Sequence, residues 1–202
     1  MSALPVATAP TLETRRLVLR PLGLQDLDAY VAFWQDPEVV RYISGTPLPR
    51  EQSWRRLLAT TGHWHLLGFG FFAIEEKASG RFIGEAGFQE MRRDLHPSIE
   101  GSLETGWGIA PDCQGKGYAS EALAAALAWA RAALPDTDFS CIVSPENRAS
   151  LHLAAKLGFA PEAQSSYQGK PIVILRMGGA KHLVAAPRAE AATSTRMPPT
   201  RS

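Results

Sequence analysis

The sequence has almost no excess of charge of either sign, because 21 Lys and Arg face 20 Asp and Glu and leave a net charge of +1. It therefore carries no global field that would favour nucleic acid or a membrane surface as a partner. No apolar stretch approaches the roughly 20 residues that a membrane-spanning helix needs. Residues 1–10 lack a basic segment followed by an apolar one, so no secretory signal is expected.

Cysteine is scarce. Cys113 and Cys141 are too few for a disulfide framework, and their spacing is not that of metal ligands. One disulfide between them stays open as an alternative, but reduced thiols in a cytoplasmic protein are the better interpretation. We therefore expect a cytoplasmic protein without a metal site.

The remaining composition is that of an ordinary globular protein, with 45% hydrophobic and 20% charged residues in a chain of 202. Residues 1–11 are rich in Ala and Pro and are expected to be flexible. Residues 178–202 are rich in Ala, Pro, Thr and Arg without an apolar period, which predicts a disordered tail. Between them we expect one domain over residues 12–177, because no repeat or linker interrupts it.

The spacing of apolar residues predicts an α/β (α+β) fold. Alternation such as that of Leu17 and Leu19 indicates strands, and signals such as Pro37 and Gly158 mark a helix start and a helix end. Strands are expected at 16–21, 69–76, 81–89, 99–110, 138–143, 160–167 and 171–177, and helices at 25–35, 37–42, 50–66, 117–134 and 147–157. Consecutive strands without a helix between them predict a mixed sheet, not a regular doubly wound one.

A glycine-rich loop joins strand 99–110 to helix 117–134. Gly115 and Gly117 can adopt positive φ and leave no Cβ in the way. Successive backbone N–H groups then form a nest for an anion, and the helix adds its unpaired N–H groups and the positive end of its dipole. A pyrophosphate fits such a place, with Lys116 at the rim. The alternative is a plain surface turn before a core helix.

Three phosphate-binding patterns compete for this loop. A P-loop does not fit, because Lys116 lies between the glycines. A dinucleotide fingerprint would need glycine at Ser120 and an acid after strand 138–143, and both are missing. Gln114-x-x-Gly117-x-Ala119 matches in full the pattern Q/R-x-x-G-x-G/A, and on this motif the chain resembles the GNAT family of N-acetyltransferases.

Further motifs resemble the same family in the same order. Residues 147–150 (NRAS) followed by 156–159 (KLGF) resemble its second signature. The segments 12–20, 36–39, 83–87 and 104–109 resemble the RimJ/RimL-like ribosomal-protein N-acetyltransferase branch. The resemblance covers about residues 12–177. It implies a GNAT fold, which is a mixed, mostly antiparallel central sheet with two splayed parallel strands, flanked by helices.

The resemblance also implies that acetyl-CoA lies between strands 99–110 and 138–143, with no metal. Alternation puts Glu104, Gly106 and Gly108 on a nearly bare face of the first strand, so that a ligand or another backbone can come close. Main-chain groups near its end are expected to pair with pantetheine and to polarise the thioester carbonyl. The expected acetyl-CoA contacts are Ile109, Ala110, Gln114, Gly115, Lys116, Gly117, Tyr118, Ala119, Ser120, Asn147 and Ser150.

The family's reaction is direct attack of a neutral amine on the thioester, which needs a base, often through water. Glu104 is the first candidate, since it lies on the open strand face. A solvated or salt-bridged strand carboxylate is the alternative interpretation of the same residue. Glu85 and Glu100 are weaker candidates, because both are compatible with simple exposure.

The departing thiolate needs a proton or a hydrogen bond. Many members of the family use a Tyr four residues before the Gly of the G-F pair, and here that position is Ala154. Ser150 lies one turn earlier on the same helix face and is the candidate donor. The alternative is that Asn147 caps the helix with Ser150 in its first turn.

The expected acceptor is a primary amine, on a protein N-terminus or a small molecule. The helices within residues 25–66 and the loop 91–98 are expected to shape the acceptor site. We expect a monomer or a homodimer, and neither nucleic acid nor a membrane as a partner. Because Ala154 stands at the position of the usual Tyr, a catalytically weak acyl-CoA-binding or sensor domain is a second hypothesis. A protein that uses the loop for another dinucleotide is a third hypothesis.

Overall fold

The computed structural model describes residues 9–178. The predicted disordered tail, apart from Gly178, and most of the predicted flexible N-terminus therefore lie outside the described residues. Within that N-terminal segment, Ala9 is buried and packs on the main core.

Every helix and strand expected from the sequence is present, with ends that differ by a few residues. The strands are β1 (Leu12–Glu13), β2 (Leu17–Arg20), β3 (Phe71–Glu76), β4 (Arg81–Gln89), β5 (Ser102–Ile109), β6 (Asp138–Val143), β7 (Ala160–Tyr167) and β8 (Lys170–Met177). The helices are α1 (Leu27–Gln35), α2 (Pro37–Val40), α3 (Arg50–Leu67), α4 (Tyr118–Ala133) and α5 (Arg148–Leu157), with 3₁₀ turns at Leu24–Asp26 and Pro111–Cys113. Only the two-residue strand β1 was not expected.

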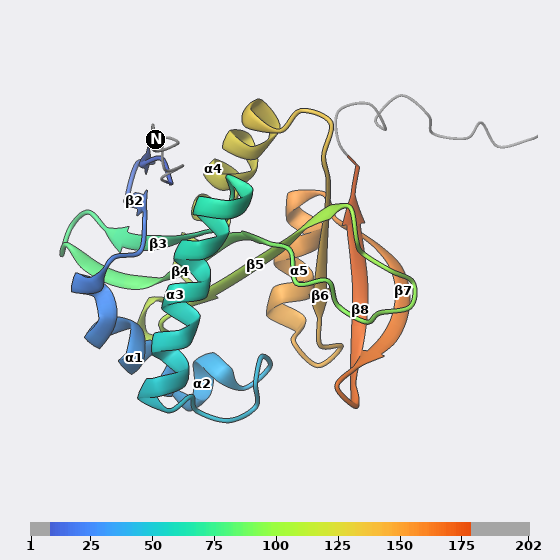
Figure 1. Ribbon diagram of the computed structural model, residues 1–202, viewed down its shortest axis with the longest axis horizontal. Helices are drawn as coiled ribbons and strands as arrows, with labels where there is room; N and C mark the ends of the chain where they lie inside the picture. The colour runs from blue at the N-terminus through green and yellow to red at the C-terminus, as the bar shows by residue number, and fades with distance from the viewer. Residues whose placement is uncertain (1–8, 179–202) are drawn as a thin grey trace, which may run out of the picture.

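The strands form one sheet in the order β1-β2-β3-β4-β5-β6-β8-β7. The β5–β6 pair is parallel, and all the other neighbouring strands are antiparallel. This arrangement confirms the predicted mixed, mostly antiparallel sheet with one parallel pair (Figure 1).

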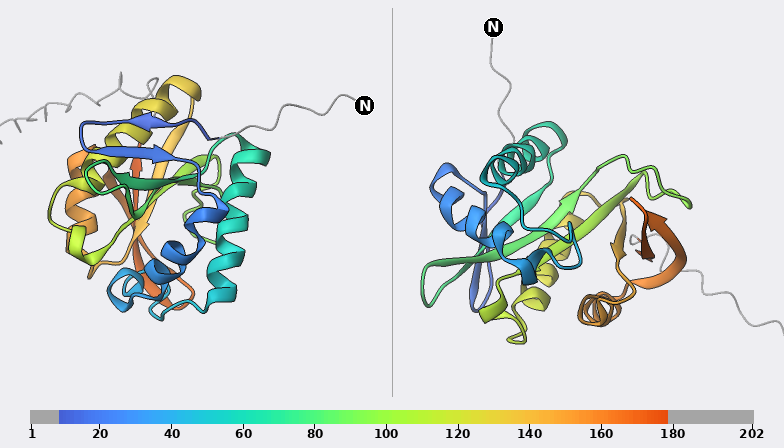
Figure 2. Two further views of the ribbon diagram at one scale, coloured as in Figure 1. Left: turned by 90° about the vertical axis from the view of Figure 1, so that its left-hand side faces the viewer. Right: turned by 90° about the horizontal axis from the view of Figure 1, so that it is seen from below.

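Helices cover both faces of the sheet (Figure 2). Helix α4 packs on one face over a core built from alternate strand residues such as Leu19, Phe72 and Ile74. Helices α1 and α3 lie on the opposite face, where Tyr30 and Leu57 belong to a second core. The two cores leave β5 central in the sheet, with a helical layer on each side.

Candidate active site

Strands β5 and β6 start side by side and then separate. Their parallel pairing covers three residues of each strand and ends at Glu104 and Ser140. Beyond this point β5 stays paired with β4 as far as Ile109, and β6 stays paired with β8 as far as Val143. Because each strand follows its other neighbour, the sheet opens between their C-terminal halves (Figure 1).

The main chain of β5 directs alternate peptide groups into this opening. The Ala110 N–H donates to the Ile83 carbonyl oxygen over 2.8 Å, on the side of β4. In an antiparallel pair, successive residues point toward and away from the partner strand. The peptide groups of Ile109 and Trp107 therefore point toward β6. Of the two predicted main-chain contacts, the Ala110 N–H is thus used by β4, whereas the peptide groups of Ile109 face the opening.

The glycine face of β5 is covered by protein. A Cβ on Gly106 would lie 2.6 Å from Phe71 Cζ, and one on Gly108 would lie 2.9 Å from Phe33 Cζ. The glycines therefore admit two buried aromatic rings, so that side chains of the protein, and not a ligand or another backbone, come close to this face. The rings separate β5 from the layer of α1 and α3.

The loop after β5 has the backbone that its glycines predict. Gly115 and Gly117 have φ of +72° and +79°, and a Cβ on Gly115 would meet nothing within 4 Å. Gln114 Nε2 donates to the Ile109 carbonyl oxygen over 3.1 Å, which ties the loop to the end of β5. Lys116 is exposed. Positive φ is thus the reason for both glycines. The space outside Gly115 is open, whereas a Cβ on Gly117 would lie 3.5 Å from Arg16 Nη2.

Helix α4 begins directly after this loop, with Gly117 as its N-cap and no side-chain cap. The first-turn N–H groups of Tyr118, Ala119 and Ser120 therefore have no partner within the helix. Together with the left-handed glycines they form a concave set of donors at the positive end of the helix dipole. An anion fits this position.

A carboxylate in the first turn of α4 is neutralised by the N-terminal segment. Glu121 accepts from Arg16 Nε over 2.7 Å and from Thr14 Oγ1 over 2.6 Å. Arg16 Nη1 also donates to the Lys116 carbonyl oxygen over 2.9 Å. Because Arg16 both offsets the negative charge and holds the loop, the anion site depends on a residue about 100 positions earlier in the chain. No local pattern in the sequence indicated this contact.

Burial acts to raise the pKa of Glu121. The hydrogen bonds from Thr14 and from the main chain and side chain of Arg16 outweigh that effect, so the pKa is lowered from its ordinary value. The carboxylate is therefore charged and paired at neutral pH.

The Tyr118 side chain turns away from the loop. Its ring is buried, its hydroxyl donates to the Glu76 carboxylate, and the Arg16 guanidinium lies 4.4 Å from the ring centre. Of the predicted contacts of Tyr118, only the main-chain N–H faces the loop.

The second signature forms the start of α5. Asn147 is the N-cap and its Oδ1 accepts from the Ser150 N–H over 3.1 Å, so the capping interpretation is confirmed. Ser150 is half-buried in the first turn, at the end of β6 that faces the opening. Ala154, at the position of the family's Tyr, is fully buried in the main core.

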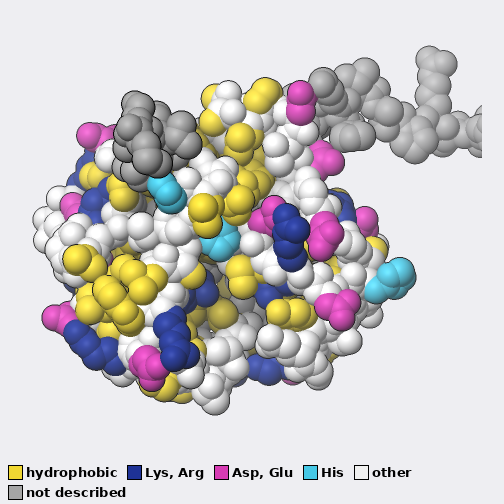
Figure 3. All heavy atoms as spheres, in the orientation of Figure 1, with side chains coloured by type: hydrophobic (Ala, Val, Ile, Leu, Met, Phe, Trp, Pro, Cys, Tyr) yellow, Lys and Arg dark blue, Asp and Glu magenta, His cyan; other side chains and the backbone are white. Residues whose placement is uncertain are grey.

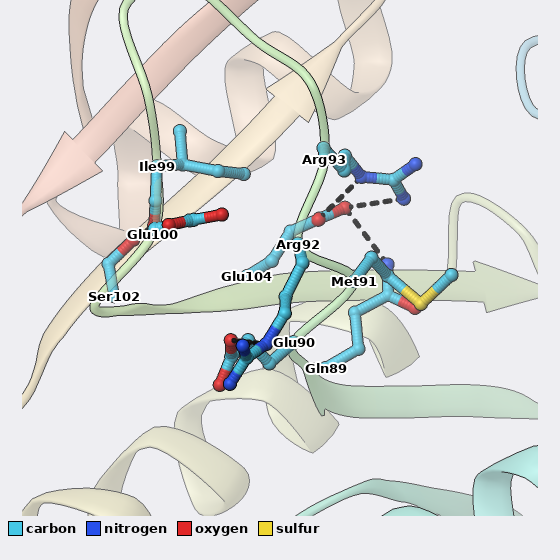
Figure 4. Close-up of a pocket in the computed structure, with 9 residues that line it drawn as sticks. All are labelled: Gln89, Glu90, Met91, Arg92, Arg93, Ile99, Glu100, Ser102 and Glu104. Carbon is cyan, nitrogen blue, oxygen red and sulfur yellow. Dashed lines mark hydrogen bonds and ion pairs between the residues drawn. The ribbon is translucent and has the colours of Figure 1, made fainter.

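Glu104 lies where β5 and β6 separate and is 5% exposed. Its Oε2 accepts from Arg93 Nε over 2.7 Å, and its Oε1 accepts from Arg93 Nη2 and Gln89 Nε2, each over 2.9 Å (Figure 4). The Arg93 guanidinium also lies 4.7 Å from the centre of the Tyr167 ring. The salt-bridged interpretation of Glu104 is thus confirmed, and about one of its roughly four acceptor positions remains for a water or a ligand.

Glu85 is not exposed as the sequence suggested. It is 2% exposed and accepts from Tyr30 Oη over 2.8 Å and from Arg56 Nη2 over 2.7 Å. Burial first, and then the charge of Glu85, raise the pKa of Tyr30 above its ordinary value. Burial acts to lower the pKa of Arg56, but Glu85 outweighs it and raises that pKa.

Glu100, by contrast, is exposed. Sequence reasoning missed Arg56 and Arg93.

Residues 9–178 contain neither a candidate metal cluster nor a membrane-spanning helix. No group of three or more His, Cys, Asp or Glu side chains there could hold a metal ion. No helix in the same range is long and apolar enough to cross a membrane.

The divided sheet and the glycine loop at the end of β5 are the features that the resemblance to the GNAT family implied. A family model described as an acetyltransferase (GNAT) domain matches residues 16–160. The chain belongs to the GNAT acetyltransferase family.

Individual relatives agree with this family. The chain is 31% identical over 153 residues to an uncharacterized N-acetyltransferase, p20, of Bacillus licheniformis, covering 75% of this chain and 83% of the relative. A solved structure from Bordetella pertussis, assigned to the GnaT acetyltransferase family, is 31% identical with a TM-score of 0.76 and covers 83% and 99% of the two chains. Spermidine N-acetyltransferase of Vibrio cholerae, solved with CoA and spermine, shares the fold at 23% identity and a TM-score of 0.67, over 84% of this chain and 99% of that one.

Proposed function

We propose that the protein transfers an acetyl group from acetyl-CoA to a primary amine in a ternary complex. The observation that carries the proposal is the junction of two features, since the opened β5–β6 pair leads directly into the anion nest before α4. A donor with a pyrophosphate at one end and an extended arm matches both features. Acetyl-CoA supplies an acetyl group that a thioester activates.

In this proposal the loop holds the pyrophosphate through the N–H groups of residues 115–120. The arm lies along β5, where the peptide groups of Trp107 and Ile109 point into the opening. A main-chain N–H there would donate to the thioester oxygen as negative charge develops on it. Asn147 and Ser150 border the arm from the start of α5.

The acceptor nitrogen must be neutral when it attacks the thioester carbon. We assign the proton to Glu104, through a water at its remaining acceptor position. The N–C bond forms as the C–S bond breaks, the thiolate leaves with the bond electrons, and the second proton lost by the nitrogen neutralises the thiolate. Ser150 Oγ is assigned the hydrogen bond to the sulfur, since Ala154 has no polar atom.

Membership of the RimJ/RimL-like branch rests on the sequence motifs and is part of this proposal, as is the cytoplasmic location. The functional test is to incubate the protein with acetyl-CoA and a panel of amines and peptide N-termini. We expect thiol release that depends on the amine, with the acetylated product identified by mass spectrometry.

One observation favours a second candidate function, a catalytically weak acyl-CoA-binding or sensor domain. Ala154 is buried in the main core, so the family's usual proton donor has neither its group nor open space at this position. Acetyl-CoA binding without thiol release for any amine in the panel would favour this alternative.

A further inference from the structure

The layer between α1 and α3 contains buried polar atoms without partners. Among residues 9–178, four buried side-chain nitrogen or oxygen atoms have no hydrogen-bond partner, and three are Trp34 Nε1, Ser53 Oγ and Arg56 Nε. Ser53 and Arg56 are neighbours three residues apart on α3. The Arg56 Cζ lies 4.1 Å from the centre of the Trp34 ring on α1. Since buried polar groups normally have partners, this cluster indicates a missing one.

All three atoms carry hydrogens that they can donate. An indole N–H and a guanidinium N–H only donate, and a hydroxyl donates as readily as it accepts. The missing partner is therefore an acceptor. A carboxylate is the strongest acceptor for a guanidinium, because its two oxygens match the guanidinium in geometry and charge.

Arg56 lies one aromatic ring away from the opened strand. Its Cζ is 5.8 Å from the centre of the Phe71 ring, and that ring packs on Gly106, two residues beyond the point where β5 leaves β6. The Arg56 side chain is 30% exposed, whereas its partner Glu85 is 2% exposed. Arg56 is therefore the more exposed partner of the pair, and Glu85 is the buried one.

The same order of charges occurs on the other side of the opening. Arg93 is 14% exposed over a Glu104 side chain that is 6% exposed. Figure 3 shows a hollow on this face, between α3 and the strands to its right, with Lys and Arg side chains in it. A second positive charge on an acceptor would meet these cations, whereas a negative group would complement them.

We propose that the acceptor is an amine that also carries a carboxylate, and that Arg56 binds this carboxylate. This inference rests on the proposed acetyl transfer, because only that reaction makes the amine an acceptor. Binding of the carboxylate by Arg56 does not itself depend on turnover. Arg56 is then a specificity-determining residue, held by Glu85 and stacked on Trp34. A polyamine is a poor acceptor in this site.

The first experiment measures binding without chemistry. The CoA-saturated protein is titrated by calorimetry with apolar α-amino acids, β-alanine and γ-aminobutyrate, and with the carboxamide of each. We expect at least one acid to bind about tenfold or more tightly than its amide, which is the effect of one charge-assisted hydrogen bond. Equal binding of acids and amides, or binding of neither, overturns the inference and leaves water as the partner of the three donors.

The second experiment uses variants. Arg56→Met leaves Glu85 buried without its cation, so it is compared with the double variant Arg56→Met/Glu85→Gln, which buries no unpaired charge. Both are expected to lose the preference for acid over amide. Arg55→Met removes an exposed arginine next to Arg56 on α3 and should keep the preference. A double variant that folds and still prefers the acid contradicts the assignment to Arg56.

Acetyl transfer to the same panel separates this inference from the proposed function. Acid binding that Arg56→Met/Glu85→Gln abolishes, without acetylation of any amine, would keep the carboxylate site and refute the transferase. Acetylation of amides or of spermidine as fast as of the acids would keep the transferase and refute the carboxylate site.

Discussion

Glu104 and Arg93 form a bidentate ion pair, with nitrogen–oxygen distances of 2.7 and 2.9 Å, at the point where β5 and β6 separate. The residue proposed to take the proton is thus held in place by a residue from the loop before β5. The pair fixes the direction of the carboxylate and leaves a restricted position for water.

Replacing Glu104 by Gln should lower kcat at neutral pH by about 100-fold, the size of effect that a positioned base contributes. Acetyl-CoA affinity should stay nearly unchanged, because the loop after β5 holds the donor. The measurement is steady-state thiol release with the best acceptor. Glu100→Gln, an exposed carboxylate four residues earlier, is the control and should keep the original rate. An unchanged rate for Glu104→Gln removes this residue as the base.

Removing Arg93 should destabilise the fold more than removing both partners. Arg93→Met leaves a buried carboxylate without its cation, which costs about 3–5 kcal/mol. The double variant Arg93→Met/Glu104→Gln buries no unpaired charge and should recover much of that loss. Urea unfolding of the three proteins gives the comparison. A single variant as stable as the double one would show that the pair is not coupled in the folded state.

The ion pair between Arg16 and Glu121 should make the free energy of unfolding decrease at acidic pH. The pKa of Glu121 is lower in the folded state than in the unfolded chain. Its contribution is therefore complete above the unfolded value, roughly 4.3, and is lost as the pH falls through the folded value. Glu121→Gln should flatten the dependence of the unfolding free energy on pH below about 5. A parallel curve for variant and parent would contradict this role.

Cys141 should cause an alkaline loss of stability. Burial, and then the charge of Glu104, raise the pKa of its thiol to about 12. In the unfolded chain the thiol ionises near 8.5, so unfolding releases a proton between these values. The unfolding free energy should therefore fall as the pH rises, by about 1.4 kcal/mol per pH unit from this group. Cys141→Ala should show a shallower fall above about pH 9, and an equal slope would refute the assignment.

The sequence was most informative where local chemistry decides the structure. The φ values of Gly115 and Gly117, the Asn147 cap and the face pattern of β5 all follow from neighbouring residues. The separation of β5 from β6 followed only from the family resemblance.

Long-range contacts could not be predicted. No residue near Arg16 in the sequence indicates its hydrogen bond to Glu121. Glu85 is predicted to be an exposed strand residue, and only the folded chain shows its contact with Arg56 of α3. The bare glycine face was misread for the same reason, since Phe71 fills it from β3.

The central claim is that the loop before α4 binds the pyrophosphate of acetyl-CoA. Calorimetric titration of the protein with acetyl-CoA, CoA and NAD tests it directly, together with Gly117→Val, which strains a residue at φ +79°. Gly68→Val, at φ +75° in the C-cap of α3, is the control for strain remote from the loop. We predict that acetyl-CoA and CoA bind, NAD does not, and Gly117→Val weakens CoA by about tenfold or more while Gly68→Val does not. Tight NAD binding without CoA binding, or CoA affinity unchanged in Gly117→Val, would contradict the claim.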